Sequence, residues 1–271
     1  MVNLGAKSRA AAVLLMAAAA APAARLTEPA RRAFQEYTAE VEARLARTGR
    51  PVTDPGVLRD GRVQIEAVHG GSWAVSGGLM HHWWAAALVP GATAREMLAL
   101  LRDYDHLERY YAPEVVSSRA LRVEGDAATI LMRFRKQKVV TVVLDAEFEV
   151  RSGLTGPGRG YSVSRSTHIW EVDHPGSASE RREPEGDDDG FLWRLNSYWR
   201  FVDTPEGLEI ECEAVSLTRD VPTGLGWLVR PIIQVLPRES LEFTLEATKK
   251  ALIHRRDAET LRNTNSREVE R

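Results

Sequence analysis

The sequence contains one cysteine in 271 residues, Cys212, so no disulfide can form within the chain. It also lacks an excess of basic residues, because 36 lysines and arginines are balanced by 38 acidic side chains. Proteins that bind nucleic acid usually carry a basic stripe, and this balance argues against such a partner. Beyond residue 23, no apolar run approaches the roughly 20 residues of a membrane-spanning helix. The fold must therefore depend on its apolar core.

The first 23 residues have the pattern of a secretory signal peptide. Lys7 and Arg9 precede an apolar run from Ala10 to Ala21, and small residues at Ala21 and Ala23 suit a cleavage site. The run is too short and too rich in alanine for a membrane anchor. We therefore expect residues 1–23 to be removed and the protein to be exported, to the periplasm or outside the cell.

Three segments have helical patterns. Residues 27–48 predict an amphipathic helix capped by Thr27, with Phe34 and Val41 on its apolar stripe. A second helix follows the turn at residues 90–91 and ends before Pro113. The third runs from Pro237 to His254, where proline suits the first helical turn.

Most of the remaining chain alternates apolar and polar residues with a period of two, which predicts half-buried antiparallel strands. The predicted strands are 79–90, 115–125, 127–137, 139–150, 161–173, 191–203 and 207–219. Short extended runs occupy 62–78. We expect a loop at 152–159 and a polar, mobile loop at 174–190, both rich in glycine or proline. A single terminal helix must then cover the dry face of the sheet.

Alternation also predicts which side chains share a face. In residues 191–203, the dry face should carry Phe191, Trp193, Leu195, Trp199 and Phe201. In the next strand, Cys212 lies on the dry face, and Glu209, Glu211 and Glu213 should lie on the wet face.

This order of elements resembles the START-like superfamily, also called the polyketide cyclase or StAR-related helix-grip fold. The resemblance covers residues 79–254 and includes Asp103-Tyr104 followed by Pro113, and the segment 226–252. It implies an α+β fold in which a curved antiparallel sheet wraps a long C-terminal helix. It further implies a hydrophobic cavity for lipids, sterols, quinones or polyketides, with no obligatory cofactor. We therefore expect four parts: a signal peptide (1–23), an N-terminal helix and extended segment (24–78), a START-like domain (79–254) and a polar tail (255–271).

Candidate cavity-lining residues follow from this fold and from the predicted dry face. One of them, Arg165, shares a face with Tyr161 and Ile169, and an inward arginine needs a carboxylate from the protein or the ligand. The opposite orientation, with Ser162 and Ser164 inward, fits the pattern nearly as well. The candidate residues are Trp84, Met132, Phe134, Leu144, Phe148, Arg165, Trp193, Trp199, Phe201, Cys212, Leu241 and Leu245.

Other polar residues have competing interpretations. Only one residue of the pair His81-His82 can face a cavity, because neighbours on a strand point in opposite directions. The remaining histidines are scattered, and we expect no metal site. Asp187 to Asp189 lack the ligand spacing of a calcium loop and predict a solvated hairpin tip. Asp103 fits either a helix cap or an acid–base group.

The sequence supports three functional hypotheses. The first is an exported carrier for a hydrophobic small molecule, with no catalytic residue, cofactor or metal. The second is a cyclase or hydratase that uses His168, Tyr161 or Asp103 for proton transfer. The third is a ligand-free interaction module in which the N-terminal helix packs across the cavity or binds a partner. A flexible lip at Gly224–Trp227 could gate the cavity or touch a membrane surface.

Overall fold

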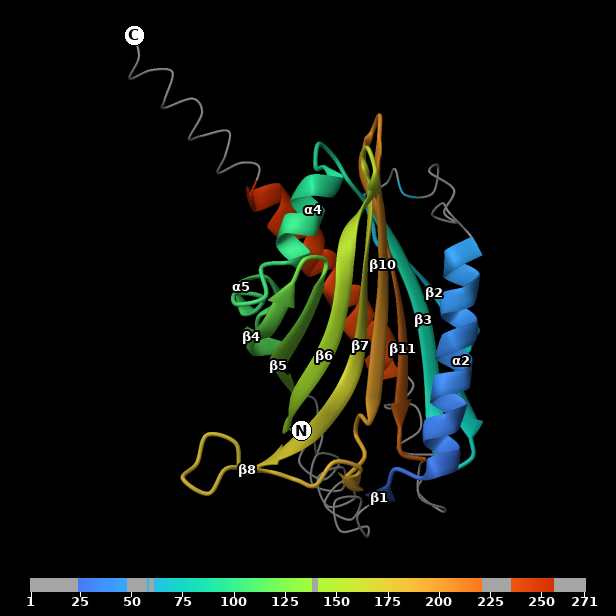
Figure 1. Cartoon of the computed structure of the whole chain (residues 1–271), viewed down its shortest axis with the longest axis vertical. Coiled ribbons are helices and arrows are strands. Elements are labelled where there is room, and N and C mark those ends of the chain that lie inside the picture. The colour runs from blue at the N-terminus through green and yellow to red at the C-terminus, as the bar shows by residue number, and fades with distance from the viewer. Residues whose placement is uncertain (1–23, 48–57, 59–60, 138–140, 221–234, 256–271) are drawn as a thin grey trace, which may run out of the picture.

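A curved antiparallel sheet dominates the computed structural model, which describes residues 24–47, 58, 61–137, 141–220 and 235–255 (Figure 1). The strands follow the order β2-β3-β11-β10-β7-β6-β5-β4, and β8 pairs with β7. The long strands are β2 (Gln64–Val75), β3 (Gly78–Val89), β4 (Val115–Glu124), β5 (Ala127–Gln137), β6 (Thr141–Gly156), β7 (Arg159–Asp173), β10 (Arg194–Thr204) and β11 (Gly207–Thr218). The short strand β8 is Arg181–Arg182, and β1 (Ala24–Arg25) pairs separately with β9 (Asp187–Asp188).

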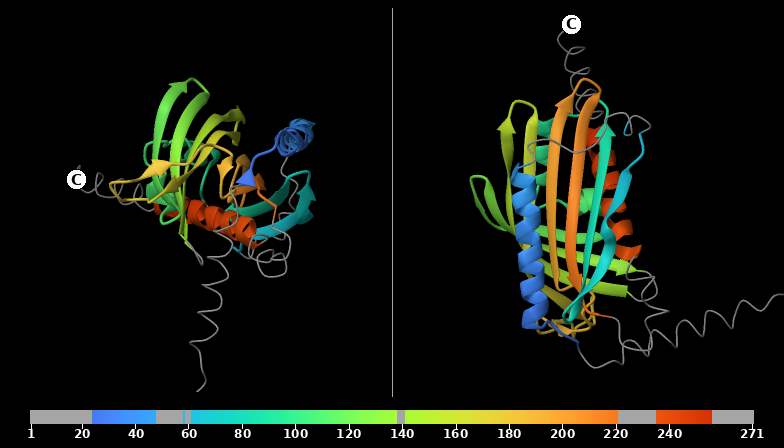
Figure 2. Two further views of the ribbon diagram at one scale, coloured as in Figure 1. Left: turned by 90° about the horizontal axis from the view of Figure 1, so that it is seen from below. Right: turned by 90° about the vertical axis from the view of Figure 1, so that its right-hand side faces the viewer.

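Helices cover both faces of this sheet. The C-terminal helix, residues 235–255, lies against one face, together with α4 (Ala94–Leu101) and α5 (Glu108–Tyr111) (Figure 2). The helix α2 (Glu28–Arg47) lies against the opposite face. We call these the inner face and the outer face. None of the helices within the described ranges is long and apolar enough to cross a membrane.

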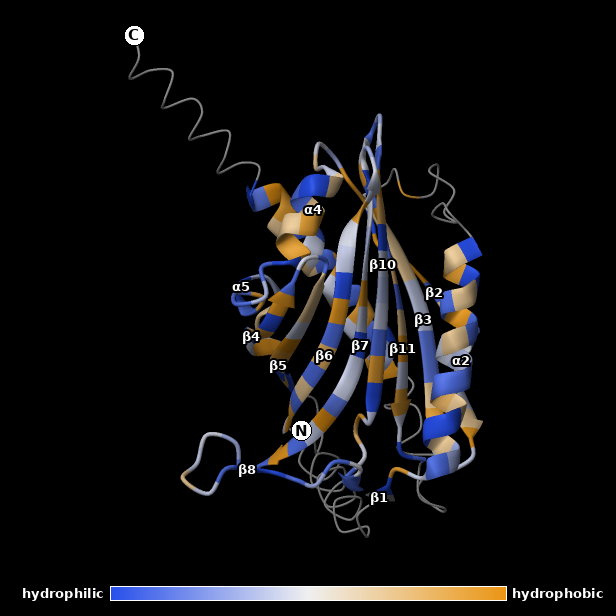
Figure 3. Ribbon diagram, viewed as in Figure 1, coloured by the Kyte–Doolittle hydropathy of each residue, from blue (hydrophilic) through white to orange (hydrophobic). Residues whose placement is uncertain are grey.

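Each face has its own apolar core, because side chains alternate along every strand. On the inner face, Leu241, Leu245 and Leu252 of the C-terminal helix pack with strand residues such as Phe201 and Ile210. The outer core is smaller. There, Phe34 and Val41 of α2 pack with outer-facing strand residues that include Met80, Tyr198, Val215 and Leu217. Figure 3 shows hydrophilic and hydrophobic residues side by side on α2, as expected for an amphipathic helix.

The predicted α+β helix-grip fold is confirmed by this topology. The helix predicted at 27–48 runs from Glu28 to Arg47, and the terminal helix occupies 235–255. Gly125, with a φ of 60°, lies in the two-residue turn expected between β4 and β5. The sheet also includes β2, which lies within the segment 24–78. The predicted leader, the tail beyond residue 255 and the segment Gly224–Trp227 lie outside the described residues.

Two boundary predictions are corrected. The second predicted helix is divided into α4 and α5, although Thr93 and Glu96 form the expected capping box at its start. Residues 152–159 are not a loop, because β6 continues to Gly156 and pairs with Arg159 of β7. The turn needs only two residues, and Gly158 adopts the positive φ of 64° that such a tight reversal favours.

The acidic segment at 187–189 is not a solvated tip. The carboxylate of Asp188 is only 4% exposed and accepts hydrogen bonds from Trp193 Nε1 at 2.9 Å and from the Gly190 backbone at 2.7 Å. These donors make burial of the carboxylate tolerable. Composition predicted a mobile, polar loop, whereas the pairing of β9 with β1 and the hydrogen bond from Trp193 hold this part of it in place.

The predicted wet face of β11 is also wrong. Glu209, Glu211 and Glu213 are 6%, 1% and 3% exposed, respectively. They do point away from the inner core, as alternation predicted. The outer face around Glu213 is buried because α2 covers it and supplies Arg44 as a charged partner.

Candidate functional site

The inner face brings together nine of the twelve predicted lining residues. They belong to one apolar cluster between the sheet and the C-terminal helix. Large aromatic side chains of this cluster come from β5, β6 and β10, and the terminal helix supplies leucines from the other side. The nine residues are Met132, Phe134, Leu144, Phe148, Trp199, Phe201, Cys212, Leu241 and Leu245.

The other three predicted residues lie on the outer face. Trp84 points away from the inner cluster because its neighbour Trp83 packs against it. Arg165 donates to Glu42 of α2 through Nε and Nη2, at 2.6 and 2.8 Å, which supplies the carboxylate it required. Trp193 precedes the first residue of β10 and packs in the outer core. The alternation of the strand did not extend to this position.

Small side chains form a band across the middle of the inner face. Ser164 of β7 pairs with Ser197 of β10, which pairs with Ala214 of β11. Trp83 of β3 completes the row beside Ala214. All four side chains are half-buried, whereas Trp199 in the next row is 6% exposed. We call Ser164, Ser197 and Ala214 the small-residue band. The inner face is less tightly covered there than around Trp199.

The amino-acid sequence alone did not indicate this band as a site. The signal was present in YSVSRS, where serines at 162, 164 and 166 recur with the period of a strand. The inward orientation of Ser162 and Ser164 was one of two alternatives for this strand, and serine, which is common in exposed loops and on polar faces, did not decide between them.

Several other inner polar groups bond to one another. His81 is fully buried between Ser72, at 2.7 Å from Nδ1, and Thr218, at 3.0 Å from Nε2. Burial lowers the pKa of His81 from 6.5 to about 4. Tyr111 pairs with Thr248 of the C-terminal helix at 3.0 Å, and burial raises the pKa of its phenol. These groups are neutral at physiological pH and already have hydrogen-bond partners.

The groups proposed for proton transfer do not converge. His168 lies on the outer side, where Nδ1 is 2.7 Å from Glu185. Tyr161 pairs in register with Arg200, an outer-face residue. Asp103 lies between α4 and α5 with His106 and Tyr110. Burial would raise the pKa of Asp103, but hydrogen bonds from Tyr110 and His106 lower it overall. Local hydrogen bonds to His106 and Tyr110 therefore account for Asp103.

A charged cluster is buried beneath α2 on the outer face. Glu213 contacts His82 Nε2 at 3.0 Å and Arg44 Nη1 at 3.1 Å, and Arg200 Nη2 is 3.7 Å away. Tyr37 of α2 lies 2.7 Å from the other ring nitrogen of His82. Burial would raise the pKa of Glu213, but bonds from His82 and Arg44 outweigh it and lower the pKa to about 2. This cluster attaches α2 to the sheet.

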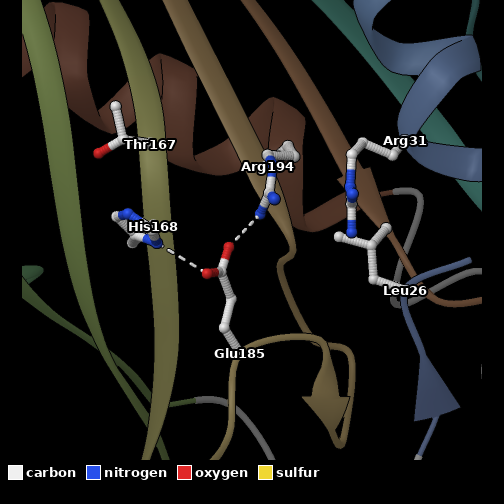
Figure 4. Close-up of a pocket in the computed structure, with 6 residues that line it drawn as sticks. All are labelled: Leu26, Arg31, Thr167, His168, Glu185 and Arg194. Atoms are coloured by element: carbon white, nitrogen blue, oxygen red, sulfur yellow. Dashed lines mark hydrogen bonds and ion pairs between the residues drawn. The ribbon is translucent and has the colours of Figure 1, made fainter. Parts of the chain in front are cut away.

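A separate cleft of about 300 Å³ opens on the outer side near the start of α2 (Figure 4). Its lining includes Leu26, Arg31, Thr167 and a bridge in which Glu185 joins His168 to Arg194. Glu185 pairs with His168 and Arg194, and Arg31 pairs with Glu28 at 3.1 Å, so the charged groups of the cleft already have partners. No group of three or more potential metal-ligating side chains occurs among the described residues.

No family model and no curated protein matches the sequence. Solved structures that are similar include a STAR-related lipid transfer protein from Xanthomonas axonopodis, with 16% identity and a TM-score of 0.46, covering 70% of this chain and 98% of the other. The Zhui aromatase/cyclase from Streptomyces sp. R1128 has 11% identity and a TM-score of 0.45, over 65% and 95% of the two chains. Human STARD10 has 14% identity and a TM-score of 0.40, over 75% and 83%. At these values, the ligands and activities of those proteins are not transferred to this chain.

Proposed function

We propose that this protein is an exported carrier for a hydrophobic small molecule bound between the inner face and the C-terminal helix. The observation that supports it best is the combination of nine clustered apolar side chains with a half-buried small-residue band. Large aromatic residues supply apolar contact, while Ser164, Ser197 and Ala214 occupy little volume. Lipids, sterols, quinones and polyketide-like molecules all fit such a surface.

Apolar burial is sufficient to drive binding at such a site. Enclosing roughly 300 Å² of ligand at about 25 cal/mol per Å² supplies roughly 7 kcal/mol before entropic costs. Those costs reduce the affinity toward the micromolar range. No catalytic group is needed to explain this function.

The arrangement of polar groups favours a carrier over an enzyme. A cyclase or hydratase needs two or more titratable groups directed at one substrate. His168 and Tyr161 lie on the outer side, and Asp103 lies between two helices. The third hypothesis loses its main support, because α2 packs on the outer face and not across the inner one.

Export and membrane contact complete the proposal. Residues 1–23 have the pattern of a secretory leader. The segment Gly224–Trp227 joins β11 to the C-terminal helix, and we propose that it touches the donor membrane during loading. Fractionation of cells that express the full chain tests export. Mature protein found only in the cytoplasm would contradict it.

Native mass spectrometry of purified protein, before and after organic extraction, tests the carrier function. We expect an added mass that extraction removes and that a lipid extract restores. Ser197→Phe should fill the band and prevent reloading, whereas Ser177→Phe, at an exposed position, should not. Circular dichroism checks that both variants fold. If Ser197→Phe does not fold, the smaller Ala214→Leu change replaces it as the variant that fills the band. Failure to load any apolar molecule would refute the proposal.

A further inference from the structure

We propose that the bound molecule carries a neutral oxygen, a carbonyl or a hydroxyl, and that Ser164 and Ser197 bind this atom. The inference rests on the proposed carrier function and specifies the ligand chemistry. It assigns the two serines as a polar subsite within an otherwise apolar inner surface.

The register brings the two hydroxyls together. Ser164 and Ser197 are directly opposed on the adjacent strands β7 and β10. Opposed side chains on one face have their Cβ atoms about 5 Å apart. Two hydroxyls at this separation can approach one oxygen atom of a ligand, and each can donate or accept a hydrogen bond.

Both hydroxyls are available. No side-chain hydrogen bond joins Ser164 or Ser197 to any residue in the described ranges, and both side chains are half-buried. Two other inner serines already have partners: Ser152 lies 3.3 Å from the Tyr104 hydroxyl, and Ser166 accepts from the Leu195 backbone at 2.9 Å. Polar groups enclosed without a partner are costly, so a ligand that covers the band should supply one.

The neighbouring side chains exclude a charged group. In the same row, Ser164 and Ser197 are flanked by Val150, Ala214 and Trp83, none of which is charged. A carboxylate or phosphate placed here would be desolvated without a counter-charge, which costs far more than burying a ketone or an alcohol. The ligand oxygen should therefore be neutral.

The test compares anthrone with 9,10-dihydroanthracene, which have nearly the same shape but differ by one carbonyl group. Dissociation constants follow from quenching of tryptophan fluorescence, with native mass spectrometry to confirm the stoichiometry. We expect Ser164→Ala combined with Ser197→Ala to weaken anthrone binding about tenfold, which corresponds to one or two lost hydrogen bonds. Binding of 9,10-dihydroanthracene should stay within about twofold. Ser117→Ala, at an exposed site on β4, is the matched control and should change neither constant.

Each outcome is decisive. If the double variant keeps the anthrone preference of the natural protein, the serine subsite is refuted while the carrier function stands. If the natural protein binds anthrone no more tightly than 9,10-dihydroanthracene, or binds neither probe, the subsite is refuted, while reloading from a lipid extract decides the carrier function separately. Ala214→Ser provides a second variant should the double change prevent folding. It adds a third hydroxyl to the row, and an unchanged ratio of the two constants in that variant would also overturn the inference.

Discussion

Glu213→Gln should destabilise the protein strongly at neutral pH, because it removes the anion from the charged cluster beneath α2. The side chain of Glu213 is only 4% exposed and contacts His82 and Arg44. Replacing the carboxylate leaves the half-exposed Arg44 and the buried His82 without a charged acceptor at this position. Removing one member of a buried ion pair typically costs more than the pair itself contributes.

The magnitude follows from the pKa of Glu213. Its folded value of about 2, against 4.5 for the free side chain, corresponds to about 3 kcal/mol at 1.36 kcal/mol per unit. The folded pKa is depressed, so this stabilisation is present above pH 4.5 and is lost as the pH falls toward 2. We therefore expect the variant to be about 3 kcal/mol less stable at pH 7 and about 1.5 kcal/mol less stable at pH 3.

Urea denaturation at both pH values measures this difference. Glu246→Gln is the control: its carboxylate is 53% exposed and pairs with Lys249 at 3.3 Å, so removal should cost less than 1 kcal/mol at either pH. Two results would contradict this prediction. One is an unfolding free energy of Glu213→Gln within 1 kcal/mol of that of the natural protein at pH 7, and the other is a loss of stability at pH 3 as large as the loss at pH 7.

Three further predictions concern other buried positions. Gly160→Ala would drive its Cβ into the ring of Phe201, and we expect a loss of about 1–3 kcal/mol in the free energy of unfolding in urea, while Gly156→Ala, which meets open space, should be neutral. His81 has a depressed pKa of about 4 in the folded protein, so as the pH falls the unfolded chain takes up a proton before the folded protein does. Relative to His81→Gln, the natural protein should therefore lose about 3 kcal/mol of unfolding free energy as the pH falls from 6.5 to 4. A difference in stability between the two proteins that does not change over this range would contradict the prediction. Burial and the nearby Asp188 raise the pKa of Glu171 to about 8, so its contribution to stability falls as the pH rises from 4.5 to 8. Glu171→Gln should therefore gain at least about 1 kcal/mol relative to the natural protein between pH 5 and pH 8, and a loss over that range would refute the assignment.

Much of the fold could be predicted because period-two alternation extends over long strands. The strands predicted at 127–137 and 207–219 correspond closely to β5 and β11, and alternation assigned Cys212 to the inner face. Alternation shows which side chains share a face, but it does not show what covers that face. For this reason Glu213 was placed in water, although α2 buries it from more than 160 residues away in the sequence.

The candidate site could be predicted only in part. Aromatic and aliphatic residues within regular strands were assigned correctly, whereas Trp193 lies just before β10, where the strand phase does not apply. Arg165 was ambiguous because the bulge opposite Glu147 and Phe148 changes the phase of β7 near Thr167. A bulge shifts every later side chain to the other face, and no local composition marked this one.

The two faces of the sheet have different roles in this account. On the outer face, α2 is held by buried ion pairs, by Arg165 with Glu42, and by an apolar core around Phe34. This attachment stabilises the central strands from the outer side, in addition to the larger inner core, and the inner face keeps a half-buried band at Ser164 and Ser197. The separation has a testable consequence. Glu213→Gln should lower stability without changing the preference for anthrone. The double serine variant should change that preference with little effect on stability. A variant that changes both properties together would argue against independent faces.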